Sequence, residues 1–307
     1  MERSQRDGML FIFLAVSGYA FLPTIVKNIQ TLGMLPLDIA LWRFTFAMPV
    51  LWLIIFLRRV PPPVQPLPRR RLLGLGVLMS AAALTAFFAL EKMPASTLIV
   101  LFYTYPTMVA IISLFLGERL SAQGWVALVL TLIGIALTVP NLGAGWDEGD
   151  LIGVGMALLN ALVVAVYYVL NSRLLRGHSS LMRASAWVIV GSFATMVLTA
   201  LIRRDVLIPD SPTMWAYLLA LATVCTVLPI FCLTIGIQKL GAPKAAIIGT
   251  VEPILTIIIA AVTLGERMEP SQVVGGVFII ASVLLLQVPS RVFALFARKR
   301  VVPEATQ

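Results

Sequence analysis

Glu252 has the clearest potential for chemistry, because its carboxyl group lies in the middle of a long apolar stretch of the sequence. An ionisable side chain inside a membrane costs roughly 2.5–3.5 kcal/mol on insertion scales, which makes it a candidate functional group. Pro253 follows directly, and a proline removes one backbone hydrogen bond and loosens the helix. The carboxyl could bind an ammonium group or take up a proton during exchange. The structural alternative is a carboxyl hydrogen-bonded between helices.

Tyr105 and Pro106 stand at the matching place earlier in the chain, 147 residues before Glu252 and Pro253. The tyrosine hydroxyl both donates and accepts hydrogen bonds, and the ring stacks on apolar or cationic groups. Tyrosines also collect at membrane interfaces, but this one lies deep in its apolar stretch. We expect Tyr105 to line the same cavity as Glu252, with both prolines breaking their helices.

Four further polar side chains fall within apolar stretches. Arg43 could bind a carboxylate with two parallel hydrogen bonds, or it could pair with helix carbonyls or form an outer gate. Lys27, near the end of its stretch, can extend to the interface, so a gating or structural role is expected. Asn160 and Tyr19 are additional cavity candidates, although polar side chains often only bridge helices.

Other chemistry finds little support in the sequence. His178 is the single histidine and falls in a predicted cytoplasmic loop, so neither a histidine-based metal cluster nor a Ser-His-Asp triad is expected. A Walker-type glycine loop is also missing. Cys225 and Cys232 lie in one apolar stretch and are interpreted as small buried residues. The sequence therefore predicts a protein that is not an enzyme and needs neither metal nor cofactor.

The elements that must position these residues are transmembrane helices. The chain is 60% hydrophobic and 12% charged, whereas a soluble domain is about half apolar and about a quarter charged. In lipid the backbone must pair internally, and apolar stretches of about 20 residues favour helices over barrel strands. Ten spans are predicted, at residues 8–29, 36–58, 72–91, 94–116, 121–140, 150–171, 181–202, 213–238, 243–265 and 271–292. Gly76, Ser80, Ala83 and Phe87 form a stripe in the third span that predicts close helix packing.

The distribution of charge predicts how these spans are oriented. The net charge is +9, and most of the 23 Lys and Arg residues fall on the side of the N-terminus. Basic residues mark cytoplasmic loops, so both termini are expected in the cytoplasm of a multi-pass protein of the inner (plasma) membrane. The basic excess is thus a topology signal, and nucleic acid is not an expected partner.

The chain also repeats itself. Leu116-Gly117-Glu118-Arg119 recurs as Leu264-Gly265-Glu266-Arg267. We interpret residues 1–140 as a first five-helix repeat, 141–149 as a connecting loop, and 150–307 as a second repeat with a short basic tail. An odd number of spans inverts the second repeat, and inverted repeats place a solute site near the bilayer midplane. Glu118, Arg119, Glu266 and Arg267 are expected to cap helices or pair with neighbours, with gating as the alternative.

Several of these residues resemble the motifs of one family. They are Ser17-Gly18-Tyr19-Ala20-Phe21, Lys27, Trp42-Arg43-Phe44, Ala89-Leu90, Pro94-Ala95-Ser96, Pro106, Gly117-Glu118-Arg119, Ala165-Val166-Tyr167-Tyr168, Glu252-Pro253 and Gly265-Glu266-Arg267. Over residues 8–290 the chain is similar to the EamA-type ten-helix exporters of the drug/metabolite transporter superfamily. The resemblance implies ten helices around a central cavity that opens alternately to each side. It also implies export of small metabolites, including aromatic amino acids, threonine and methionine. Ser17 stands where the family commonly has tryptophan.

Several functions remain open at this point. The leading hypothesis is a secondary-active or facilitative exporter of amino acids, with the lipid bilayer and, in the exchange mode, protons as partners. A lipophilic-cation exporter is the alternative, since Glu252 and aromatic rings suit a cation. A sugar-phosphate or nucleotide-sugar carrier should show several cations in the cavity. A membrane scaffold without transport is the hypothesis from a different class.

Overall fold

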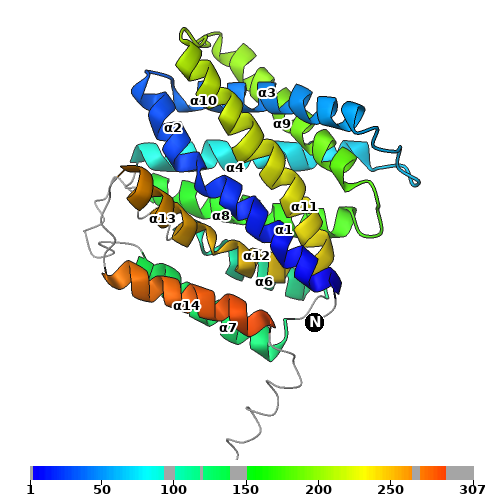
Figure 1. Ribbon diagram of the computed structural model, residues 1–307, viewed down its shortest axis with the longest axis vertical. Coiled ribbons are helices and arrows are strands. Elements are labelled where there is room, and N and C mark those ends of the chain that lie inside the picture. Colours follow the sequence, from blue (N-terminus) through cyan, green and yellow to red (C-terminus); the bar gives the residue numbers. More distant parts are fainter. Residues whose placement is uncertain (1–2, 93–100, 118–119, 139–150, 265–269, 288–307) are drawn as a thin grey trace, which may run out of the picture.

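The computed structural model describes residues 3–92, 101–117, 120–138, 151–264 and 270–287, and this part of the chain is folded into helices (Figure 1). In the first half these are α1 (Arg3–Ala20), α2 (Leu22–Thr31), α3 (Pro36–Leu57), α4 (Arg69–Lys92), α6 (Tyr105–Phe115) and α7 (Ala122–Thr138). The second half contains α8 (Leu151–Leu174), α9 (Leu181–Arg203), α10 (Pro212–Ala222), the π-helical turn η2 (Thr223–Val227), α11 (Leu228–Leu240), α12 (Ala242–Gly249), α13 (Glu252–Leu264) and α14 (Pro270–Gln287). The predicted all-helical class is confirmed for these residues.

Five helical segments are long and apolar enough to cross a membrane, counting only the residues with a described position. They are Ser4–Thr31, Pro36–Leu57, Ile152–Leu174, Leu181–Arg203 and Pro212–Leu240. Shorter apolar helices accompany them at Tyr105–Phe115, Ala122–Leu137 and Val273–Ser282. Large apolar side chains such as Phe56 and Ile202 are exposed on the outside of the bundle, as lipid contact requires. The molecule is a multi-pass membrane protein.

Prolines and glycines set many of the helix boundaries. Proline occupies one of the first two positions of α2, α3, α6, α10, α11 and α12, where its fixed φ angle suits the start of a helix. Gly33 and Gly241 follow the ends of α2 and α11 with φ angles of 90° and 82°. Glycine adopts this left-handed region without steric cost. The tight turns after α2 and α11 follow from these residue types.

The helices pack mainly against partners from the other half of the chain. Helix α1 lies along α11, and α4 lies between α8 and α9 (Figure 1). Helix α3 contacts α9 and α10, while α6 contacts α8 and α12. Helices α7 and α14 pair with each other at one end of the view. Long-range contacts between the halves therefore build the central part of the bundle.

The glycine-and-serine stripe in α4 marks a close helix contact, as the sequence predicts. A Cβ atom on Gly76 would lie 2.2 Å from the carbonyl oxygen of Val188 in α9. Ser192 donates a hydrogen bond of 3.0 Å to the Gly76 carbonyl, and Ser80 donates one of 3.2 Å to the Ser192 carbonyl. Small residues let the two backbones approach, and the serines then join them.

Several predicted spans contain interruptions that the sequence interpretation treats as continuous helix. The first span is broken at Phe21, two residues before Pro23. The eighth contains η2, and π-helical turns occur as local bulges inside α-helices. In both cases a proline lies just C-terminal to the irregular residues and removes an N–H donor.

Candidate functional site

Two helix breaks of the same form lie at the matching prolines. Turns at residues 103–104 and 250–251 precede α6 and α13, which begin at Tyr105 and Glu252. Within these turns Thr104 and Thr250 each donate a side-chain hydrogen bond of 2.6 Å to the carbonyl three residues earlier. Each following proline lacks the N–H that would reach the carbonyl four residues before it. Backbone acceptors without their helical donors are thereby left beside Tyr105 and Glu252.

Tyrosine rings gather around the first of these breaks. Tyr105 lies with its ring centroid 5.5 Å from that of Tyr168 in α8 and 6.1 Å from that of Tyr103. The Tyr167 and Tyr168 ring centroids are 6.5 Å apart, and the Phe102 ring is tilted against Tyr105 with the centroids 5.2 Å apart. All four tyrosines are buried. We call Tyr103, Tyr105, Tyr167 and Tyr168, together with Tyr19 of α1, the tyrosine cluster.

Gly249 makes room for this cluster at the second break. A Cβ atom at this position would lie 2.7 Å from the hydroxyl oxygen of Tyr105 and 3.3 Å from that of Tyr168. The Tyr105 hydroxyl donates a hydrogen bond of 3.2 Å to the carbonyl of Ala246, one turn earlier in α12. Tyrosines of the first and second halves therefore meet on the backbone of α12.

Glu252 lies beside the tyrosine cluster. Its charge acts on Tyr19, Tyr103, Tyr105 and Tyr168, which places the carboxyl within electrostatic range of each. The residue is only partly buried. Among the described residues, no hydrogen bond or ion pair to its carboxyl group is found. A carboxylate without a partner in an apolar setting is costly, so binding of a cation or a proton would be favourable here.

Arg43 of α3 lies within electrostatic range of the Tyr19 hydroxyl. Its Nε atom donates a hydrogen bond of 2.6 Å to Thr226 Oγ1, and Nη2 donates one of 2.9 Å to the carbonyl of Cys225. Both acceptors belong to η2. The guanidinium thus binds a helix carbonyl, which is one of the alternatives that the sequence leaves open.

Gly18 lets α1 approach the same irregular turn. A Cβ atom here would lie 2.5 Å from the carbonyl oxygen of Val224 and 2.6 Å from Cγ of Pro229. The adjacent Ser17 hydroxyl donates to the Phe13 carbonyl of its own helix, at 2.8 Å. Ser17 thus bonds within α1, while Gly18 brings α1 onto the bend between α10 and α11.

The remaining predicted residues fall into two groups. The side-chain amide of Asn160 in α8 donates to the carbonyl of Ala82 and, at 3.1 Å, to Thr85 Oγ1 in α4, so Asn160 bridges two helices away from the tyrosine cluster. The other predicted positions lie outside what the structure describes: the side chain of Lys27, and the whole of Glu118, Arg119, Glu266 and Arg267.

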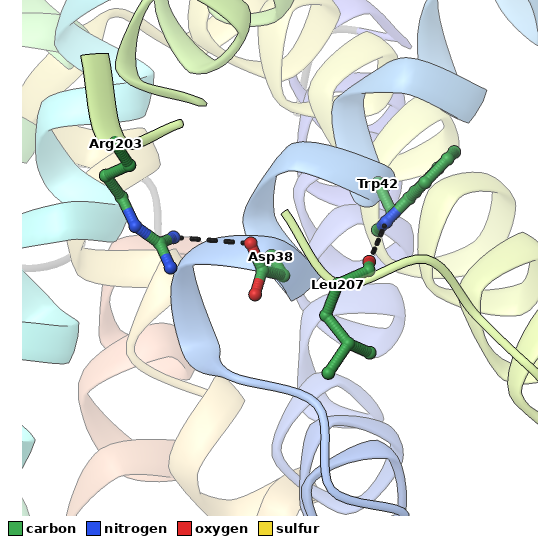
Figure 2. A network of polar contacts seen from close by, with 4 residues as sticks. All are labelled: Asp38, Trp42, Arg203 and Leu207. Carbon is green, nitrogen blue, oxygen red and sulfur yellow. Dashed lines mark hydrogen bonds and ion pairs between the residues drawn. The ribbon is translucent and has the colours of Figure 1, made fainter. Parts of the chain in front are cut away.

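A buried ion pair was not foreseen from the sequence. Asp38 in the first turn of α3 accepts a hydrogen bond of 3.2 Å from Arg203 in the last turn of α9, and its side chain is 2% exposed (Figure 2). One turn further along α3, Trp42 Nε1 donates to the carbonyl of Leu207 at 2.9 Å. An acid at a helix N-terminus and a base at a helix C-terminus both complement the helix dipole, and that pattern is the signal by which the pair could have been found.

Tyr103, Tyr167, Tyr168 and Gly249 were also missed as site residues. Tyr168 belongs to a motif of the family resemblance, and Tyr103 lies two residues before the predicted Tyr105. Gly249 gives no signal in the sequence, because its importance comes from two side chains distant along the chain. Across the described residues, no three His, Cys, Asp or Glu side chains are grouped so as to hold a metal ion.

Comparison with known proteins shows related sequences along nearly the whole chain. The model of the EamA-like transporter family matches residues 6–139 and again residues 151–288. The uncharacterized transporter YcbK of Bacillus subtilis (strain 168) is 28% identical over 290 residues, which cover 91% of this chain and 92% of that protein. An uncharacterized transporter of Archaeoglobus fulgidus is 25% identical over 219 residues, covering 71% of this chain and 76% of its own length.

A solved crystal structure shows the same fold. It superposes with a TM-score of 0.79 over 97% of this chain and 99% of its own chain, at 18% sequence identity. At this identity the likeness concerns the fold alone. Sequence and fold comparisons thus agree over both halves.

Proposed function

This chain belongs to the EamA-like transporter family, and we propose that it exports small solutes that carry an ammonium group, with amino acids as the first candidates. The transport mode is alternating access, either facilitative or coupled to uptake of a proton by Glu252. The protein is a transporter by family, and the substrate class is our proposal.

The observation that carries this proposal is the position of Glu252. Its carboxyl has no described side-chain partner, and its charge acts on four tyrosines of the cluster. An ammonium group would supply the missing counter-charge, and aromatic faces attract cations. The site lies where two broken helices meet, which is the usual place for a solute in transporters with discontinuous helices.

The packing pattern supports two inverted five-helix repeats, residues 1–140 and 150–307. In such a repeat α8 is the counterpart of α1, and α11 is the counterpart of α4. The contact of α1 with α11 then corresponds to the contact of α8 with α4, and both contacts are present. The contact of α6 with α8 becomes that of α13 with α1, and both are present. The pair α7–α14 maps onto itself. This symmetry and the double match of the family model support ten membrane spans around a central cavity.

The charge distribution supports an orientation with both termini in the cytoplasm. Arg58, Arg59, Arg69, Arg70 and Arg71 cluster at the connection between α3 and α4. Basic residues remain on the cytoplasmic face during insertion. With this orientation, we place the protein in the plasma membrane of a bacterial-type cell, the inner membrane where a cell has two.

Export of lipophilic cations is the second candidate function, and the tyrosine cluster favours it, since its rings would stack on large aromatic cations. A sugar-phosphate carrier fits less well. Arg43 is the basic residue that acts electrostatically on the described tyrosine cluster, through Tyr19. Its guanidinium is already hydrogen-bonded to η2, which leaves little positive charge for a phosphate. A scaffold without transport would have no use for an unpaired carboxyl at membrane depth.

Flux into liposomes that contain the purified protein tests the proposal. Labelled phenylalanine, methionine, threonine, a sugar phosphate and a quaternary ammonium ion are compared with empty liposomes. We expect saturable movement of the amino acids in the native protein, and at least a tenfold loss in Glu252→Gln. Asp205→Asn, which removes an exposed loop acid between α9 and α10, serves as the matched control.

The outcomes separate the hypotheses. Movement of only the quaternary ion supports cation export instead of amino-acid export, and movement of only the sugar phosphate rejects the proposed site. Unchanged flux in folded Glu252→Gln rejects the role of this carboxyl. Absence of flux for every solute, in a sample shown to be folded, rejects transport of these classes.

A further inference from the structure

We infer that the site recognises its substrate by the ammonium group alone, so that amines without a carboxylate are substrates in their own right. This inference rests on the proposed function and narrows its substrate class. It predicts that the decarboxylated counterpart of an amino acid binds at least as well as the amino acid. The reason is that the carboxyl of Glu252 has no partner among the described residues, whereas the guanidinium of Arg43 is hydrogen-bonded to η2.

The acidic end is open for binding. The Glu252 carboxyl is unpaired among the described residues, and Tyr103, Tyr105 and Tyr168 lie within range of its charge. Pro253 cannot donate to the carbonyl of Gly249, one turn before it. An ammonium group has three N–H donors, and a carboxylate, tyrosine oxygens and a free backbone carbonyl offer it acceptors. The surrounding rings add a cation–π attraction.

The basic end is already occupied by the protein. A guanidinium binds a carboxylate best through two parallel N–H groups. The Nε and Nη2 atoms, which form the side-on edge of Arg43, are used by Thr226 Oγ1 and the Cys225 carbonyl. A substrate carboxylate that binds this side-on edge would have to displace both bonds. It would also leave the Cys225 carbonyl without the donor that Pro229 fails to provide.

No second cation replaces Arg43 in the described part of the site. Of the charges that act on Tyr19, Tyr103, Tyr105, Tyr167 and Tyr168, the single basic one is that of Arg43, on Tyr19. A carboxylate entering the cluster would instead meet Glu252 and be repelled by it. An amine without a carboxylate avoids both this repulsion and the cost of removing a carboxylate from water.

Three compounds of the same shape test the inference on the full-length protein in detergent. They are phenethylamine, which carries only the ammonium group, phenylalanine, which carries both charges, and phenylpropionate, which carries only the carboxylate. Affinity is measured by ligand-induced thermal stabilisation. We expect phenethylamine to bind as tightly as phenylalanine or more tightly, and phenylpropionate to bind at least tenfold more weakly.

Substitutions at the two ends then identify the groups responsible. Glu252→Gln should weaken the binding of phenethylamine by about tenfold or more, and tenfold corresponds to about 1.4 kcal/mol. Arg43→Gln should leave the ratio of phenylalanine to phenethylamine affinity unchanged, because Arg43 does not bind the carboxylate. Phenylalanine binding tenfold better than phenethylamine, or losing that advantage in Arg43→Gln, would overturn the inference.

The same compounds in liposome flux separate this inference from the proposed function. Movement of phenylalanine without phenethylamine would leave transport established and reject recognition by the ammonium group alone. Binding of phenethylamine in detergent without flux of any compound would support the inference and reject export. The comparison of three ligands uses the native chain, so it does not depend on whether any variant folds.

Discussion

The Nη2 atom of Arg43 lies 2.9 Å from the carbonyl oxygen of Cys225, an acceptor that cannot receive the usual helical hydrogen bond because Pro229 follows four residues later. The side chain of α3 thereby completes the backbone hydrogen bonding of the eighth predicted span. Thr226 completes the arrangement, since its hydroxyl accepts from Arg43 Nε and donates to the Leu221 carbonyl at 2.8 Å. A cation inside the membrane is thus explained by an irregular turn in another helix.

Arg43→Gln should destabilise the folded protein. The variant loses a charge-assisted donor to a backbone carbonyl in an apolar setting, and hydrogen bonds to charged groups contribute about 1.5–3 kcal/mol. We expect a lower melting temperature in detergent. Arg43→Lys keeps the charge but cannot form the same pair of hydrogen bonds. Its melting temperature should therefore fall between those of the native protein and Arg43→Gln. A Gln variant as stable as the native protein would mean that η2 needs no donor from α3.

Gly249→Ala should impair substrate binding without unfolding the protein. The new Cβ would lie 2.7 Å from the Tyr105 hydroxyl, so the tyrosine must move and lose its bond to Ala246. We expect at least tenfold weaker binding of the substrate in the thermal-stabilisation assay. Gly155→Ala is the matched control, because a Cβ there meets nothing within 4 Å. Equal behaviour of the two variants would show that the position of Tyr105 does not matter for binding.

Gly76→Ala should weaken the contact between α4 and α9. Its Cβ would lie 2.2 Å from a backbone carbonyl that cannot move independently of its helix. Overpacking of this kind costs about 1–3 kcal/mol. Gly74→Ala, two residues away on the same helix, adds a Cβ to open space. Thermal unfolding should show a clearly lower melting temperature for Gly76→Ala and almost no change for Gly74→Ala. Similar decreases in the two variants would contradict the assigned packing.

The Asp38–Arg203 pair should show a measurable coupling between α3 and α9. Asp38→Asn, Arg203→Gln and the double variant form a cycle, and residues in direct contact usually couple by about 0.5–3 kcal/mol. Asp38 is the more buried partner, with 2% of its side chain exposed against 26% for Arg203. Loss of Arg203 should therefore destabilise the protein more than loss of both. Additive effects in detergent unfolding would show that the pair contributes nothing.

The proposed orientation can be checked with single cysteines at two exposed glutamines. Gln30 lies near the end of α2, and Gln65 lies between α3 and α4. In intact cells, a membrane-impermeant thiol reagent should label Gln30→Cys and reach Gln65→Cys only after the membrane is opened. The native Cys225 and Cys232 are buried and provide the unlabelled background. The reverse labelling pattern would place the termini outside.

The sequence predicts the helical class, most helix boundaries and the paired positions of Tyr105 and Glu252. These features depend on local properties: apolar stretches of membrane-spanning length, prolines at helix starts, and a repeat visible at one spacing. The third helix illustrates the agreement, predicted at residues 36–58 and found as Pro36–Leu57. Helix packing at Gly76 could also be predicted, because small residues one turn apart rarely have another use in a membrane.

The partners of individual side chains could not be predicted from local pattern. Arg43 meets a carbonyl more than 180 residues away along the chain, and only the assembled bundle reveals that this carbonyl needs a donor. Gly249 matters because Tyr105 and Tyr168 converge on it. Asn160 illustrates the opposite case, since a polar residue of suitable depth faces α4 and not the tyrosine cluster. Such distinctions depend on which face of a helix meets which neighbour.

The contact between α1 and α11 has a consequence for biosynthesis. A ribosome adding 5–20 residues per second needs roughly ten to forty seconds to synthesise the chain between these two helices. During that interval the glycines Gly8 and Gly18, which later fit against α11 and its bend, face lipid or an insertion factor. The first half of the protein therefore waits in the bilayer for the second. A translational stall within the second half would leave an unassembled intermediate open to proteolytic quality control.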